Sequence, residues 1–146
     1  MTRVFRATRL FRMICLGSLI AGLAGCGAPS GRTCAPGYGA PTAVFTLYLG
    51  TAIPGRGDLT DKEWQSFLND TVTANLPNGY TILDARGAWM NPITRRTIKE
   101  PTKILVVALP DVPESLAAVN RIRTKYQLEF HQQLVGMITE QACSAF

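Results

Sequence analysis

From residue 43 onward, segments whose hydrophobic residues recur with the period of a strand alternate with segments that have the period of a helix. Residues 43–50 (AVFTLYLG) are rich in branched and aromatic residues, which predicts a strand. Thr60 and Glu63 have the spacing of a capping box, in which each side chain satisfies a backbone N–H of the other. A helix is predicted after it, because one apolar stripe follows: Trp64, Phe67, Leu68, Thr71 and Val72.

Two strands and a second helix are predicted next. Residues 80–90 and 103–109 are the strands, and residues 91–100 form a polar connection between them. Asp111 is the expected cap of the second helix, with Pro113 in its first turn. Its buried stripe is Val119, Ile122, Tyr126 and Phe130. A last strand is predicted at residues 134–139.

The order strand, helix, strand, strand, helix, strand predicts an α+β domain over residues 43–146. The same order of elements is found in the ferredoxin-like split β-α-β arrangement (βαββαβ), which is a four-stranded antiparallel sheet with two helices on one face. Right-handed crossovers would place the first and third strands at the centre.

The first 25 residues have the layout of an export signal. Four arginines precede an apolar run at residues 13–23, and small residues follow. The run is too short to cross a bilayer as a helix. Residues 23–26 (LAGC) resemble a bacterial lipobox, which predicts a lipoprotein signal peptide at residues 1–25 and a lipid on the sulfur of Cys26. An uncleaved apolar anchor and an ordinary signal with a chance cysteine are the alternatives.

Residues 26–42 are rich in Gly and Pro and have no helix or strand period, which predicts a flexible tether. Several acyl chains on one residue would hold the protein stably at a membrane. Gly27, in place of an aspartate, resembles the address for the outer membrane of Gram-negative cells. We therefore expect an exported protein, anchored at the outer membrane and facing the periplasm.

The net charge of +5 does not predict nucleic-acid binding. Four of the 15 basic residues lie in the first twelve positions, which leaves 11 basic against 10 acidic residues from position 26 onward. With one histidine in the chain, no metal site can be assembled, and no cofactor is expected.

Cys34 and Cys143 flank the domain. In the predicted topology the last strand pairs antiparallel with the first, so the end of one lies beside the start of the other. Paired thiols are expected in an exported protein. We predict a disulfide between them; two unpaired thiols are the alternative.

Several segments in order resemble a bacterial family catalogued as domain of unknown function 3574 (DUF3574), over about residues 34–146. The matching segments are residues 47–50 (LYLG), Trp64 with Phe67 and Leu68, Val72 and Thr73, Pro77 and Gly79, residues 83–89 (LDARGAW), residues 100–103 (EPTK), Ile122 and Arg123 with Tyr126, Phe130, Gln132 and Val135, and Cys143. The chain departs from the pattern at Met90, where arginine is frequent, and at Leu134, where serine is expected. The resemblance implies no activity.

Strand alternation places candidate binding residues on the sheet face away from the helices. If Phe45, Leu47 and Leu49 face the helices, Tyr48 faces away. We assign Asp84 and Arg86 to the same outward face, with Trp89 as a further candidate. A surface ion pair between Asp84 and Arg86 is the alternative. Glu100 and Lys103 lie near the predicted connection, where they either bind a ligand or form a solvated turn.

These residues predict a lipid-anchored envelope protein that binds a small ligand or a protein, as a homodimer through the sheet face. A cofactor-independent enzyme of the dimeric α/β-barrel type, with Asp84 as base and Arg86 holding an anion, is the alternative. No catalytic nucleophile is recognisable, so an enzyme is the less favoured interpretation.

Overall fold

The structure is a computed structural model, and it describes residues 33–146. Its main sheet is antiparallel and has the strand order β4-β5-β1-β6. The strands are β1 (Ala40–Gly50), β4 (Thr81–Met90), β5 (Thr97–Pro110) and β6 (Gly136–Ser144). The predicted α+β class, with four antiparallel strands and two helical segments, is confirmed, and it is consistent with a ferredoxin-like fold. The predicted signal peptide and Cys26 lie outside the described residues.

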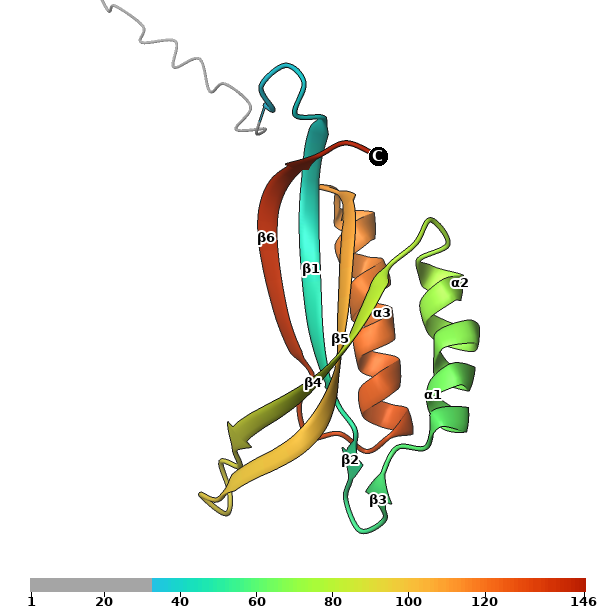
Figure 1. Cartoon of the computed structure of the whole chain (residues 1–146), viewed down its shortest axis with the longest axis vertical. Coiled ribbons are helices and arrows are strands. Elements are labelled where there is room, and N and C mark those ends of the chain that lie inside the picture. Colours follow the sequence, from blue (N-terminus) through green and yellow to red (C-terminus); the bar gives the residue numbers. More distant parts are fainter. Residues whose placement is uncertain (1–32) are drawn as a thin grey trace, which may run out of the picture. The chain divides into compact units, whose positions relative to one another are not determined.

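Both helical segments cover one face of the sheet (Figure 1). The first is continuous through α1 (Asp61–Phe67), a π-helical turn η1 (Leu68–Val72) and α2 (Thr73–Asn75). The second is α3 (Pro113–Glu129). The π turn was not predicted; in it, the Thr73 N–H donates to the Leu68 carbonyl. Both Thr71 and Val72 are buried in this turn, as the predicted stripe requires.

The predicted capping box begins α1. The Thr60 hydroxyl accepts from the Glu63 N–H, and the Glu63 carboxylate accepts from the Thr60 N–H. Arg56 donates two hydrogen bonds to the same carboxylate, at 2.6 and 3.0 Å. Hydrogen bonds from Arg56 and, as a smaller contribution, from Thr60 lower the pKa of Glu63 to about 2.

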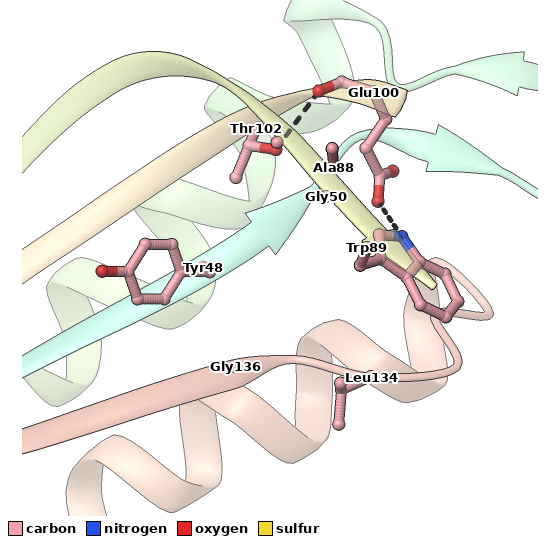
Figure 2. A pocket seen from close by; sticks show the side chains of 9 residues that line it. Tyr48, Gly50, Ala88, Trp89, Glu100, Thr102, Leu134 and Gly136 are labelled. Carbon is pink, nitrogen blue, oxygen red and sulfur yellow. Dashed lines mark hydrogen bonds between the residues drawn. The ribbon is translucent and has the colours of Figure 1, made fainter. Parts of the chain in front are cut away.

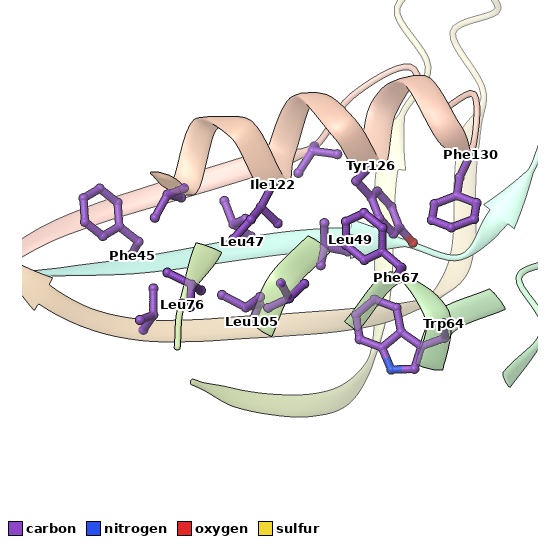
Figure 3. Packing of buried hydrophobic residues seen from close by; sticks show 14 of the residues in the cluster. Phe45, Leu47, Leu49, Trp64, Phe67, Leu76, Leu105, Ile122, Tyr126 and Phe130 are labelled. Carbon is purple, nitrogen blue, oxygen red and sulfur yellow. The ribbon is translucent and has the colours of Figure 1, made fainter. Parts of the chain in front are cut away.

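The core lies between the helices and the sheet (Figure 3). Leu47 and Leu49 of β1 and Leu105 of β5 are fully buried beneath the helices. Trp64, Phe67, Tyr126 and Phe130 form an aromatic cluster with ring centroids 4.9 to 6.4 Å apart. Most of these ring pairs meet edge to face, a favoured geometry because the ring edge is positive and its face negative.

Several predicted boundaries are wrong. Strand β5 begins at Thr97, so residues 97–100 of the expected polar connection are strand. Strand β1 begins at Ala40 and β6 extends to Ser144, since the two ends pair with each other. A short hairpin of β2 (Ala52–Ile53) and β3 (Gly57–Asp58) precedes α1 and was not predicted.

Asp111 does not cap α3. The N-cap is Val112, which makes no side-chain capping bond, and Pro113 opens the helix. The Asp111 carboxylate instead accepts a hydrogen bond from the Gln141 amide on β6. Proline at the first helical position makes a side-chain cap less necessary, because it has no N–H to satisfy.

Cys34 and Cys143 are joined by a disulfide, with the two Cα atoms 5.8 Å apart. This is the pairing that the sequence predicts. The register of β1 with β6 places Pro41 opposite Cys143, which brings the segment before β1 beside the end of β6. Over residues 33–146, no helix combines the length and apolar character needed to cross a membrane.

We predict that replacing both cysteines (Cys34→Ser with Cys143→Ser) lowers the free energy of unfolding by about 4 to 5 kcal/mol. The bond closes a long loop, with a sequence separation of 109, and restricts the unfolded chain most strongly for long loops. Urea unfolding of the oxidised protein, the reduced protein and the double variant measures this. Equal transition midpoints for oxidised and reduced protein would contradict it.

Candidate functional site

The register of the sheet determines which side chains share a face. Directly opposed residues of antiparallel strands point to the same side. Leu47 pairs with Leu105, and Leu105 with Ile82, so this row faces the helices and the core. The next row, Tyr48 with Ile104 and Leu83, faces away from the helices; we call this side the open face.

Asp84 and Arg86 do not share a face with Tyr48, and that expectation is wrong. Leu49 pairs with Lys103 and Lys103 with Asp84, which places Asp84 on the helix side of the sheet. Arg86 lies two residues after Asp84 on β4, so it also points to the helix side of the sheet. Ile82 and Leu83 are adjacent apolar residues, so the sequence pattern of β4 fits either orientation. The pairing of Ile82 with Leu105 selects the one observed.

Asp84, Arg86 and Lys103 border a groove beyond the start of α1. Lys103 forms an ion pair with Asp84, and its ammonium lies 5.7 Å from the centroid of the buried Trp64 ring. The predicted alternative, an ion pair between Asp84 and Arg86, is replaced by this one. Asp84 is 80% exposed, so the pair contributes less than about 1 kcal/mol.

Tyr48, Trp89 and Glu100 come together on the open face, where they line a pocket of about 240 Å³ (Figure 2). Glu100 was expected at the end of the polar connection, and Lys103 at the start of the following strand. Both lie on β5, and they point to opposite faces because their positions differ by an odd number. We call this hollow the open-face pocket; its other lining residues are Gly50, Gly87, Ala88, Thr102, Leu134 and Gly136.

Two hydrogen bonds hold the Glu100 carboxylate in place. Oε1 accepts from the Trp89 indole Nε1–H at 2.8 Å, and Oε2 accepts from the Ala52 N–H at 3.1 Å. Ala52 begins β2, two residues after the end of β1, and Trp89 lies on β4. Glu100 therefore joins three parts of the chain at one carboxylate.

Glycines leave room for this carboxylate and for Thr102. A Cβ on Gly50 would lie 2.6 Å from the Cδ and both oxygens of Glu100. A Cβ on Gly87 would lie 2.7 Å from the Thr102 hydroxyl. Sequence reasoning named neither as a site residue. The available signal was glycine inside a strand, which often marks a close approach of another group.

The core supports the pocket from behind. The buried Tyr126 hydroxyl donates to the Gly50 carbonyl at 2.9 Å. Burial is the larger cause and the charge of Glu100 the smaller one; together they raise the pKa of the Tyr126 phenol above its ordinary value. The neutral phenol is therefore held as a donor to the strand that carries Tyr48 and Gly50.

A side-chain bond attaches the β4–β5 hairpin to the segment before β6. The Asn91 amide donates to Gln133 at 3.2 Å, and its carbonyl oxygen accepts from the N–H groups of Ile93 and Thr94. Leu134 follows Gln133 and forms a wall of the pocket while remaining 59% exposed. In the described part of the chain, no three His, Cys, Asp or Glu residues are arranged to hold a metal.

A family model described as a protein of unknown function, DUF3574, matches residues 45–146. The chain belongs to this family. Segments that carry the resemblance in the sequence meet at the open-face pocket: Tyr48 with Gly50, Gly87 with Trp89, and Glu100 with Thr102. Leu134, one of the two departures from the DUF3574 pattern, lines the same pocket.

Similar solved structures extend the comparison to the fold. A phage SAM lyase in complex with S-methyl-5′-thioadenosine is 12% identical, with a TM-score of 0.57, covering 80% of this chain and 90% of that one. Its apo state is 14% identical, with a TM-score of 0.52, covering 78% and 90%. CutA from Synechococcus elongatus PCC7942 with bound Bis-Tris has a TM-score of 0.46 at 10% identity, covering 73% and 85%. No curated protein matches significantly. At these identities the likeness to the SAM lyase concerns the fold alone.

We predict that Gly50→Ala displaces the Glu100 carboxylate and breaks its bond to Trp89. The free energy of unfolding should fall by about 1 to 3 kcal/mol, the usual range for losing a hydrogen bond to a charged group. The ¹⁵N–¹H signal of the Trp89 indole should shift toward that of an unbonded indole. Gly136→Ala is the matched control, because its added methyl meets Tyr48 at an ordinary 3.4 Å. An unchanged Trp89 signal in Gly50→Ala would refute the crowding.

Proposed function

We propose that this DUF3574 protein is a lipid-anchored protein of the bacterial envelope whose ferredoxin-like domain binds a small ligand in the open-face pocket. The observation that carries the proposal is a single anchored carboxylate, Glu100, in a hollow otherwise lined by apolar, aromatic and glycine residues and by Thr102. Binding sites for small molecules typically combine mostly apolar walls with a few fixed polar groups.

The scaffold of the pocket supports a binding role. Its lining residues come from all four strands of the main sheet: Tyr48 from β1, Trp89 from β4, Thr102 from β5 and Gly136 from β6. Groups on paired strands are held more rigidly than groups on loops. The volume of about 240 Å³ is below the usual range for drug-sized ligands, so the pocket suits a compact molecule or one end of a longer one.

Export is supported by the sequence of residues 1–26 and by the cysteines of the domain. A disulfide such as Cys34–Cys143 is typical of proteins in oxidising compartments. In the described residues this bond lies at the end of the domain where β1 begins, which is also the end nearest to the proposed lipid on Cys26 along the chain.

We predict that cells expressing the protein incorporate radiolabelled palmitate into it and retain it in the membrane fraction. Cys26→Ser should abolish both the label and the membrane retention, because the thioether forms on that sulfur. Cys34→Ser is the matched control and should still be labelled. Wild-type protein that takes up no palmitate and fractionates with the cytosol would refute the anchoring.

We predict that at least one small molecule in a fragment set shifts the Trp89 indole signal and not that of Trp64. The chain has two tryptophans, and Trp64 is buried in the core, so the two indole signals separate pocket from core. S-methyl-5′-thioadenosine is one probe to include, because the similar SAM lyase structure contains it. The full-length protein in an uncharged maltoside detergent is the sample.

A blocked pocket provides the control for that experiment. Leu134→Phe enlarges an exposed wall residue and should weaken every ligand that shifts Trp89. Leu128→Phe makes the same change on the outer side of α3, where Leu128 is 70% exposed, and should leave binding unchanged. Ligands that bind both variants equally would place the binding elsewhere, and a fragment set without any Trp89 response would refute the proposal.

The alternative enzymatic function has no comparable support. It assigned Asp84 as base and Arg86 as anion holder in a cavity closed by two stacked sheets, whereas both residues belong to the helix side of the sheet. The homodimer through the sheet face stays a prediction. Exposed apolar side chains on that face, Leu83 at 51% and Ile138 at 48%, are compatible with it.

A further inference from the structure

We propose that the open-face pocket selects a compact organic cation, an ammonium or quaternary ammonium group, through Glu100 and the Trp89 ring. This inference deepens the proposed function and rests on it, since it names the chemical class of the ligand. It follows from the charge of the pocket, from the hydrogen-bonding capacity that Glu100 retains, and from the aromatic wall beside it.

The charge of the pocket is negative and has no bonded counter-ion. Glu100 is the one residue among the nine lining residues that is charged at neutral pH. The ion pairs within residues 33–146 join Arg56 to Glu63, Lys103 to Asp84 and Lys125 to Glu129, and none includes Glu100. A partly buried carboxylate in apolar surroundings is favourable only with compensating partners, and a cation is the strongest of these.

The basic residues Lys99 and Arg86 do not line this pocket. They line a second hollow of the hairpin, to which Glu100 also contributes. Their strand positions have the parity of the helix side, because Lys99 pairs with Ala88 and Arg86 with Pro101, whereas Glu100 pairs with Gly87. The open-face pocket therefore receives the carboxylate of Glu100 without these cations.

Glu100 keeps acceptor capacity after its two protein bonds. Each carboxylate oxygen has two lone pairs, and each accepts one N–H, from Trp89 or from Ala52. The remaining lone pairs are available to the N–H groups of an ammonium, and the charge attracts a quaternary ammonium without any hydrogen bond. An anionic ligand would be repelled by the same charge.

The aromatic wall adds a preference for cations. The hydrogen bond to Glu100 holds the half-buried Trp89 indole beside the carboxylate, and Leu134 also lines the pocket (Figure 2). Tryptophan is the aromatic side chain that attracts cations most strongly through its ring face. A positively charged head group can then contact the ring while its charge faces Glu100. The head group must be small, because the volume of the pocket is only about 240 Å³.

The test compares two molecules of nearly equal shape. Choline carries a quaternary ammonium, and 3,3-dimethylbutan-1-ol has a neutral carbon in place of the nitrogen. Titration of the full-length protein in maltoside detergent, followed by the Trp89 indole signal with Trp64 as internal reference, gives both affinities. We expect choline to bind about tenfold or more tightly than the alcohol.

Variants assign the preference to Glu100. Glu100→Gln keeps the size of the side chain and should weaken choline about tenfold while leaving the alcohol unchanged. Asp84→Asn is the matched control, since it removes one negative charge from the other face of the sheet and should change neither affinity. The dispersion of the two indole signals in each variant verifies that it is folded.

The outcomes separate this inference from the proposed function. Equal affinity for both molecules would overturn the cation preference while leaving a small-ligand pocket in place. An unchanged preference in Glu100→Gln would overturn the role of the carboxylate. Saturation by neither molecule would also overturn the inference, and the fragment experiment would then decide the proposed function independently.

Discussion

The pairing of β1 with β5 is the constraint on which the rest of this structure depends. It aligns Leu47 with Leu105, and through that row it determines which residues of the sheet enter the core and which face solvent. Because side chains alternate along a strand, a shift of one residue would reverse every position. The same register places Glu100 on the open face and Lys103 on the helix side.

The open-face pocket and the core share a boundary at Gly50. Its carbonyl accepts from the buried Tyr126 hydroxyl, and the absence of its side chain makes room for the Glu100 carboxylate. Glycine inside a strand normally weakens the sheet. Here the bonds of Glu100 to Trp89 and Ala52 and of Tyr126 to Gly50 hold the end of β1 in place. The open-face pocket is therefore supported by the packing of α3 as well as by the strands.

The sequence predicted the fold more completely than the site. Helix stripes such as Val119, Ile122 and Tyr126 are long enough to identify one buried face without ambiguity. Near the start of strand β4, Ile82 and Leu83 are adjacent apolar residues, so the sequence pattern does not reveal which of the two faces of the strand is buried. Of the six candidate binding residues, Tyr48, Trp89 and Glu100 meet at the pocket, while Asp84, Arg86 and Lys103 border a different groove.

By itself, the amino-acid sequence determined the α+β class, the family and the pairing expected for Cys34 and Cys143, since these depend on local periodicity, ordered motifs and the number of cysteines. Only the tertiary structure decided that Glu100 meets Trp89 and Gly50 across three strands. Such contacts depend on register and on strand twist, and neither is encoded in any short stretch of residues.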